Sequence, residues 1–177
     1  MDTKIVKVDP NNIDIKIIKE ASEIIKAGGI VVFPTETVYG IGADALNEEA
    51  VDKIFKAKGR PQDNPLIVHI AEMDQLERLV KEVPKESEEL AKKYWPGPIT
   101  ILFNKKEIIP DKITGGLKTV AIRMPNNNIA LSLIKESGKP IAAPSANISG
   151  KPSTTEAAHV IEDLMGKVDM IIDGGST

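Results

Sequence analysis

The chain of 177 residues is long enough for one domain, and its 41% hydrophobic and 28% charged residues are typical of a globular protein. Its formal net charge of −3 argues against a dedicated nucleic-acid coat, because such domains are usually basic. The lack of cysteine excludes disulfides, thiolate zinc sites and cysteine nucleophiles, and no apolar run approaches the ~18 residues of a membrane span. The N-terminal segment MDTKIVKVDP does not resemble a signal peptide, so we expect a cytoplasmic protein with no membrane partner.

Apolar spacing, together with glycine and proline breaks, predicts strands and helices that alternate along the chain. We expect a strand at 4–8, a helix at 13–26, a strand at 30–33, a helix at 48–58 and a strand at 66–70. Two helices follow at 73–83 and 84–94, then a strand at 99–103, a loop at 105–118 and a strand at 120–123. The last elements are a helix at 129–137, a strand at 141–143, a helix at 157–165 and a strand at 168–172. This interleaving predicts a mixed sheet with helices on its faces.

Several local signals set the expected boundaries. Gly28 and Gly29 end the first helix, and the continuous apolar run that follows predicts a strand covered on both faces. Asn47 is a suitable N-cap for the helix at 48–58. The sequence Ser153-Thr154-Thr155-Glu156 predicts a capping box ahead of the helix at 157–165.

The stretch from Gly28 to Asp44, GGIVVFPTETVYGIGAD, places polar side chains directly after a core strand. These side chains belong to Thr35, Glu36, Thr37 and Tyr39. Because binding sites are commonly built on loops at strand ends, we interpret this stretch as the floor of a binding pocket. Glu36 is either a base or a structural acceptor, and the sequence leaves both roles open.

Basic residues end two other predicted elements. Lys58 and Arg60 lie at the C-terminus of the helix at 48–58, where they either complement the helix dipole or clamp a phosphate. Arg123 ends the strand of TVAIRMP, where its guanidinium either meets a ligand carboxylate or forms a surface salt bridge. From each residue alone, both alternatives stay open.

The loop from Ser145-Ala146-Asn147 to Ser153 carries hydroxyls and an amide after a strand. It either turns toward an anion or forms a plain Asx or Ser turn, and it matches neither the P-loop nor the dinucleotide-binding glycine motif. His69 lies in an apolar strand, a position more often structural than catalytic. With His159 as the only other histidine, a multi-histidine metal site is excluded, and we expect no protein metal site.

Six segments of the chain carry these residues in a fixed order. They are KAGGIVVFPTETVYGIGADA, KIFKAKGRPQDNPLIVHI, YWPGPITILF, TVAIRMP, PIAAPSANISGKPSTT and IIDGG. Together they resemble the YrdC/TsaC-type threonylcarbamoyl-AMP synthase family from about Ala21 to the end of the chain. The KxR pair reads Lys58-Gly59-Arg60, and the SxN pair reads Ser145-Ala146-Asn147. Any single motif is weak, whereas six in order are specific.

The resemblance implies a single YrdC-like α+β domain over residues 1–177, with a twisted mixed parallel and antiparallel sheet, helices on both faces and an open positive cleft. It implies a nucleotidyltransferase that condenses L-threonine, bicarbonate or CO2 and ATP to threonylcarbamoyl-AMP and pyrophosphate. Mg²⁺ would be held mainly by the ATP phosphates. A downstream transferase complex would then modify adenosine in tRNAs that read ANN codons.

The resemblance also implies roles for individual residues. Lys58 and Arg60 would be catalytic. The expected L-threonine contacts are Thr35, His69, Arg123 and Ala143. The expected ATP contacts are Lys58, Arg60, Asn64, Thr119, Ser145, Asn147 and Ser153.

The family pattern continues after IIDGG with a further glycine, a Ser-Thr-Val type strand and often an arginine, whereas this chain ends at Thr177. We therefore expect the closing segment, with a threonine-contacting serine and an ATP-contacting arginine, to be missing. An alternative function is an RNA-binding module, for tRNA or double-stranded RNA, that uses Lys56, Lys58 and Arg60 without turnover. Carbamoyl transfer, as in hydrogenase-maturation proteins with a similar domain, is disfavoured because those proteins also carry cysteine zinc fingers.

Overall fold

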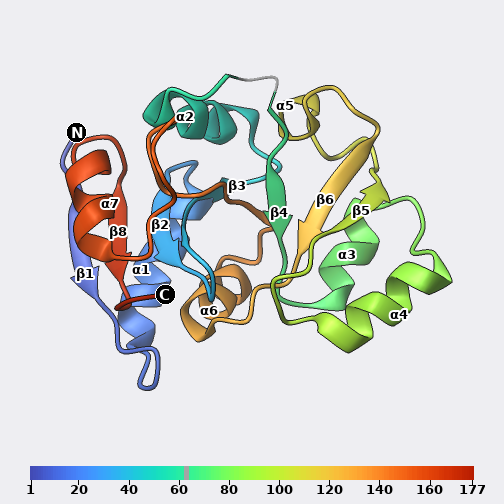
Figure 1. The fold of residues 1–177 in the computed structure, drawn as a ribbon, viewed down its shortest axis with the longest axis horizontal. Helices are drawn as coiled ribbons and strands as arrows, with labels where there is room; N and C mark the ends of the chain where they lie inside the picture. The colour runs from blue at the N-terminus through green and yellow to red at the C-terminus, as the bar shows by residue number, and fades with distance from the viewer. Residues whose placement is uncertain (62–63) are drawn as a thin grey trace.

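A mixed β-sheet crosses the molecule and carries helices on both faces (Figure 1). The computed structural model describes residues 1–61 and 64–177. The strands within these residues are β1 (Lys4–Lys7), β2 (Val31–Pro34), β3 (Tyr39–Asp44), β4 (Ile67–His69), β5 (Ile101–Asn104), β6 (Thr119–Arg123), β7 (Ile141–Ala142) and β8 (Met170–Asp173). They are ordered β1-β8-β2-β3-β7-β4-β6-β5.

The helices that pack on the two faces of the sheet come from all along the chain (Figure 1). Within the same residues they are α1 (Ile15–Lys26), α2 (Glu48–Lys58), α3 (Met73–Leu79), α4 (Lys85–Tyr94), α5 (Asp111–Thr114), α6 (Asn128–Ser137) and α7 (Ala157–Leu164). None of these described helices has the length and hydropathy needed to cross a membrane.

Strand pairing is parallel at three places and antiparallel elsewhere in the described sheet. Strand β8 pairs in parallel with β1 and β2, and β4 pairs in parallel with β6. The remaining neighbours, including the β2–β3 hairpin, are antiparallel. The expected mixed sheet with helices on both faces is therefore confirmed.

Two apolar clusters hold the layers together. One lies between the sheet and helices α1 and α6, and includes Val31, Phe33 and Ile141 from the strands. The larger cluster lies on the other face, against α2 and α7 toward the β1 end and against α3, α4 and α5 toward the β5 end (Figure 1). Because both faces of β2 and β3 are covered, every residue of these two strands is buried.

One face of the sheet is left open over β4, β6 and β5. Side chains alternate along these strands, and one set, which includes Val68, Val120 and Phe103, belongs to the larger core cluster. The other set points away from that core, and its member Leu102 is 66% exposed. Since α1 and α6 cover this side only at the far end of the sheet, the open half is available for a site.

Most predicted elements are confirmed, with boundaries that differ by a few residues. Asn47 caps α2 by accepting a hydrogen bond from the Ala50 N–H, as expected. The capping box before α7 is wrong, because the N-cap Glu156 caps no backbone N–H with its side chain and instead accepts from Ser176 Oγ. The sequence also missed β3 and the short helix α5, and α3 ends earlier than expected.

One glycine of β3, Gly42, makes room for an aromatic ring on the neighbouring strand. A Cβ at Gly42 would lie 2.5 Å from Phe33 Cε1 and 2.8 Å from Ile141 Cγ2, whereas a Cβ at Gly40 would meet its nearest neighbour, Ala143 Cβ, at 3.4 Å. Gly42→Ala is therefore expected to lower the free energy of unfolding by about 1–3 kcal/mol through overpacking, measured by urea denaturation. Gly40→Ala, in the same strand, is the matched control. Equal stability of the two variants would contradict this account.

Candidate functional site

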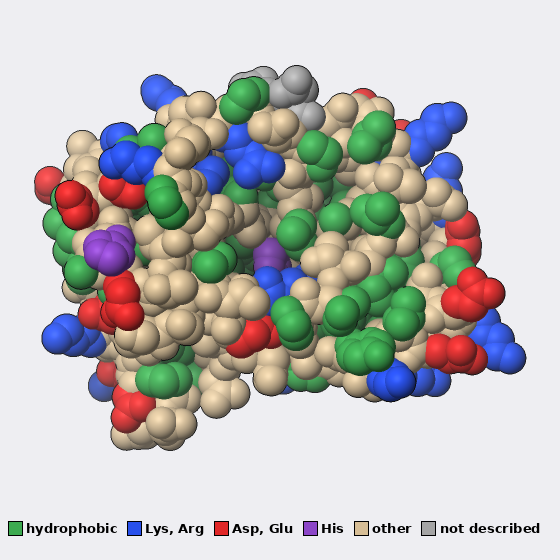
Figure 2. Space-filling model, in the orientation of Figure 1, with side chains coloured by type: hydrophobic (Ala, Val, Ile, Leu, Met, Phe, Trp, Pro, Cys, Tyr) green, Lys and Arg blue, Asp and Glu red, His purple; other side chains and the backbone are tan. Residues whose placement is uncertain are grey.

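A cleft of about 280 Å³ opens where several strands end beside the open sheet face. Its described lining consists of Val38, Arg60, Pro65, Leu66, Ile67, His69, Arg123, Ala143, Pro144 and Ser145. Figure 2 shows a hollow near the middle of this face, with Lys, Arg and His side chains gathered around it. The structure thus brings five of the predicted site residues together: Arg60, His69, Arg123, Ala143 and Ser145.

Sheet register places His69 beside Arg123. The two residues are paired at the ends of the parallel strands β4 and β6. Parallel strands present their carboxyl ends at the same edge of a sheet, which is why residues far apart in sequence meet here. Ala143 follows β7, the antiparallel neighbour of β4, and its N–H donates to the Ile67 carbonyl at 3.1 Å.

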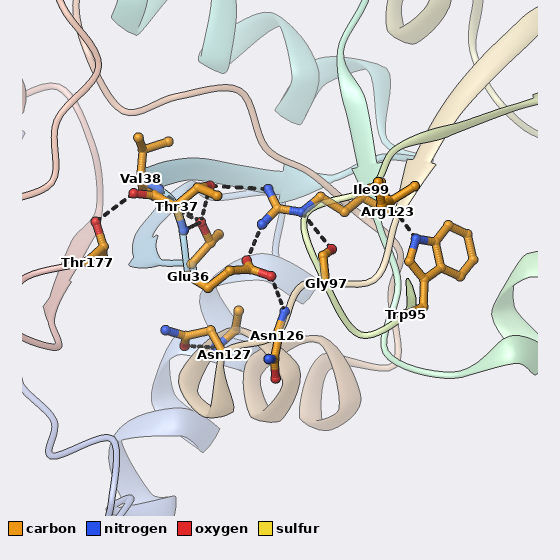
Figure 3. Close-up of polar contacts among 12 residues, drawn as sticks. Glu36, Thr37, Val38, Trp95, Gly97, Ile99, Arg123, Asn126, Asn127 and Thr177 are labelled. Carbon is orange, nitrogen blue, oxygen red and sulfur yellow. Dashed lines mark hydrogen bonds and ion pairs between the residues drawn. The ribbon is translucent and has the colours of Figure 1, made fainter. Parts of the chain in front are cut away.

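Arg123 is only 8% exposed, and three residues from two segments contact its guanidinium (Figure 3). Its Nη2 forms an ion pair with Glu36 Oε1, and its Nε donates to the Gly97 carbonyl at 3.3 Å. Its Nη1 lies 3.5 Å from Thr37 Oγ1, the longest of the three contacts. Arg123 therefore meets a carboxylate of the protein itself in a partly buried pair, which differs from the surface salt bridge considered from the sequence.

His69 is 2% exposed, and its Nδ1 has no hydrogen-bond partner among the described residues. Burial, and secondarily the charge of Arg123, lowers the pKa of His69 to about 3. The imidazole is therefore neutral near pH 7, so it adds no second positive charge beside Arg123. A neutral imidazole can donate one hydrogen bond and accept another.

Arg60 supplies a second cation to the cleft. Its Nη2 donates to the Pro65 carbonyl at 2.9 Å, while its buried Nε has no partner among the described residues. Burial lowers the pKa of Arg60, although guanidinium remains charged at any physiological pH. Buried polar nitrogens without a partner are uncommon, so Arg60 Nε and His69 Nδ1 mark the cleft as a place for a polar ligand.

Lys58 lies behind the cleft lining and is 2% exposed. Its ammonium donates to the carbonyl oxygens of Ser145 and Asn147, the latter at 2.8 Å. Burial, and secondarily the charge of Arg60, lowers the pKa of Lys58 to about 8. Its backbone carbonyl also accepts from the Ser149 N–H at 2.8 Å, so Lys58 joins the end of α2 to the loop after β7.

The loop after β7 uses its polar side chains largely within itself. Ser145 Oγ donates to Asn147 Oδ1 at 2.5 Å. Asn147 Nδ2 donates to the carbonyls of Ile148 and Lys151, at 2.9 and 2.8 Å. Asn147 is buried, whereas Ser145 lines the cleft. The polar side chains of this loop therefore form a turn, as one of the two interpretations predicted, and Ser145 is the only one of them within the described lining of the cleft.

The remaining predicted residues lie outside the cleft lining. Thr35 is buried in the β2–β3 turn, where its Oγ1 donates to the Val38 carbonyl at 2.6 Å. Thr119 is at the opposite end of β6 from Arg123, about 13 Å away along the strand, on the same sheet face. Ser153 lines a separate hollow beside α7. Asn64 is exposed before β4.

Sequence reasoning missed several parts of the site. The pairing of Glu36 with Arg123 was not predicted, and neither was the role of the Gly97 carbonyl, although Gly97 lies in the segment YWPGPITILF. Tyr39, assigned to the pocket, instead donates from its hydroxyl to the Gly175 carbonyl at 2.6 Å, and burial raises its pKa. Among residues 1–61 and 64–177, no group of three or more His, Cys, Asp or Glu side chains is arranged to hold a metal ion.

Comparison with known proteins places this geometry in context. The sequence model of Sua5/YciO/YrdC, described as "Telomere recombination", matches residues 23–177. The threonylcarbamoyl-AMP synthase of Pyrococcus abyssi is 62% identical over 160 residues, which cover 90% of this chain and 47% of that protein. The threonylcarbamoyl-AMP synthase of Bacillus subtilis is 54% identical over 161 residues, which cover 90% of this chain and 46% of that protein.

The crystal structure of P. abyssi Sua5 complexed with L-threonine matches with a TM-score of 0.96 at 59% identity, and the match covers 99% of this chain and 51% of that one. The chain therefore spans about half the length of the curated relatives it matches.

The lowered pKa of His69 leads to a direct test. The ring resonances of His69 should not shift between about pH 5 and pH 8 in the folded protein, whereas in urea the same imidazole should titrate near about 6.5. Because the folded pKa lies below the unfolded one, His69 costs stability as the pH falls from about 6.5 toward 3. Proton-carbon NMR with a His69→Asn variant for assignment provides the measurement. An inflection within that pH range would refute the buried neutral imidazole.

Proposed function

The chain belongs to the Sua5/YciO/YrdC family, and we propose that it is an L-threonylcarbamoyladenylate synthase. The proposed substrates are L-threonine, bicarbonate or CO2 and ATP, and the products are threonylcarbamoyl-AMP and pyrophosphate. The observation that carries this proposal is the cleft in which Arg60, Arg123 and neutral His69 converge. Its relatives in P. abyssi and B. subtilis bear the name of this activity.

The residue types in the cleft suit a reaction that needs positioning rather than a protein nucleophile. The amine of threonine takes up CO2 to give a carbamate, and a carbamate oxygen then attacks the α-phosphorus of ATP. The bond from the α-phosphorus to the bridging oxygen breaks, and pyrophosphate leaves. Both steps require held reactants, and the second also requires neutralised phosphate charge. Positioning and charge stabilisation account for much of the catalysis of phosphoryl and nucleotidyl transfer.

Arg123 is the proposed anchor for the threonine carboxylate. A guanidinium forms strong charge-assisted hydrogen bonds with carboxylates, and Arg123 is held beside His69 at the wall of the cleft. The relative from P. abyssi, whose structure contains L-threonine, is 59% identical in the matched region, which covers 99% of this chain and 51% of that one. Ala143, small and buried, leaves room for the bound amino acid.

Arg60 and Lys58 are the proposed cations for the phosphates. Arg60 lines the cleft directly, and Lys58 would act through the loop that it joins to α2 or, after releasing those carbonyls, on a phosphate. Mg²⁺ would enter as part of the MgATP substrate, held by phosphate and water oxygens as is usual for this ion. The described cleft lining contains no carboxylate, which suits a polyanion arriving with its own metal.

The product is a mixed anhydride of a carbamic acid and a phosphate, so a second enzyme must use it before water does. We propose that this partner is the transferase complex that modifies adenosine in tRNAs reading ANN codons.

Pyrophosphate release tests the proposed activity. In the presence of MgATP and bicarbonate, the protein should release pyrophosphate only when L-threonine is added, as measured by a coupled phosphate assay. Omission of bicarbonate under CO2-free conditions is the matched control. Pyrophosphate release that does not depend on threonine would refute the proposal, and calorimetric titration of each substrate separates binding from turnover.

Arg123→Ala tests the assignment within the cleft. Because a charge-assisted hydrogen bond contributes about 1.5–3 kcal/mol, threonine affinity should fall at least about tenfold while ATP affinity is kept. The exposed Arg78 on α3 gives the matched control, Arg78→Ala. Titration calorimetry of both ligands on both variants is the measurement. Equal losses for threonine and ATP in Arg123→Ala would contradict the role.

A further inference from the structure

The turn between β2 and β3 holds Glu36 on a braced backbone. Thr35 Oγ1 accepts hydrogen bonds from the N–H groups of Thr37 and Val38, each at 3.2 Å, and donates to the Val38 carbonyl at 2.6 Å. On the other side, Thr177 Oγ1 donates to the Thr37 carbonyl at 2.9 Å (Figure 3). The turn is therefore closed by its own first residue and supported from the chain's last one.

The Glu36 carboxylate joins this turn to the end of β6. One oxygen forms the ion pair with Arg123 Nη2, and the other accepts the Asn126 N–H at 2.7 Å (Figure 3). Both oxygens of the carboxylate are thus held, and both partners belong to the segment that leads from β6 to α6. A carboxylate fixed at both oxygens is a rigid support rather than a mobile surface group.

The ion pair with Glu36 leaves some N–H groups of the Arg123 guanidinium available for a ligand. Within the described residues, Nη2 pairs with Glu36, Nε bonds Gly97, and Nη1 has only the long contact with Thr37. Arginine carries more N–H groups than these three bonds use. Glu36 is the only carboxylate among the described residues that forms an ion pair with Arg123.

We propose that Glu36 is a positioning residue, which fixes the Arg123 guanidinium so that its remaining N–H groups face the carboxylate of the amino-acid substrate. This inference rests on the proposed function, in which Arg123 binds that carboxylate. Glu36 does not touch the substrate and acts only through Arg123. A fixed guanidinium loses less conformational freedom when the substrate binds, which is how a supporting residue increases affinity.

Glu36→Gln removes the charge while nearly keeping the size of the side chain. The variant should bind L-threonine about tenfold more weakly, with unchanged ATP affinity and a raised KM for threonine at nearly constant kcat. Glu89→Gln, at an exposed position on α4, is the matched control. Calorimetric titration of L-threonine and of ATP gives the affinities, and a thermal scan confirms that each variant is folded.

A double-mutant cycle tests whether Glu36 affects threonine affinity through Arg123. In an Arg123→Ala background, Glu36→Gln should cause no further loss of threonine affinity, because the two residues act as one unit. Tighter threonine binding by Glu36→Gln would mean that Glu36 competes with the substrate and would overturn the inference. Equal losses for threonine and ATP would reveal a merely structural role and would also overturn it. Unchanged threonine binding by the variant overturns this inference alone, whereas no threonine binding by the unmodified protein overturns the proposed function as well.

Discussion

The near-complete burial of one guanidinium, that of Arg123, governs the arrangement of the cleft. A buried charge without a partner is strongly unfavourable, so the fold must bring acceptors to it from elsewhere. Those acceptors come from the β2–β3 turn and from the turn at Gly97, which are distant from β6 in sequence. Because a buried ion pair contributes little net stability, its main consequence is geometric, and three segments are held in one relative position.

The sheet forms the cleft that the Arg123 guanidinium lines. Strands β4 and β6 run in parallel and end together, so His69 and Arg123 become neighbours at one edge. On the same side of the sheet, the layer formed by α1 and α6 packs on β2, β7 and β8 and leaves β4, β6 and β5 uncovered. The cleft therefore follows from where a helix layer stops, and it does not require a separate domain.

The sequence predicted those parts of the fold that depend on local periodicity. Strand β3 was missed because Gly40 and Gly42 remove its alternating side chains. Gly42 is needed because the Phe33 ring on the neighbouring strand fills the space of a Cβ. The capping box failed for a similar reason. Thr154 Oγ1 donates to the Ala146 carbonyl and Glu156 accepts from Ser176, so tertiary partners replace the local ones. Local patterns cannot reveal a competitor that lies far along the chain.

In the site, too, the residue types could be predicted from local motifs, whereas partners far along the chain could not. Arg60, His69 and Arg123 were identifiable through the ordered motifs of the family resemblance, whereas each residue alone left a structural role open, and the structure gathers them. The sequence could not show where the Lys58 side chain points. Its partners are backbone carbonyls, and every residue has one. Both Lys58 and the Ser145–Asn147 side-chain bond stabilise one loop. The Lys58 ammonium binds the loop's backbone carbonyls, and the Ser145–Asn147 bond lies within the loop. The KxR and SxN pairs are therefore two halves of a single structural unit, whose lysine shapes the loop on which the cleft-facing Ser145 is carried.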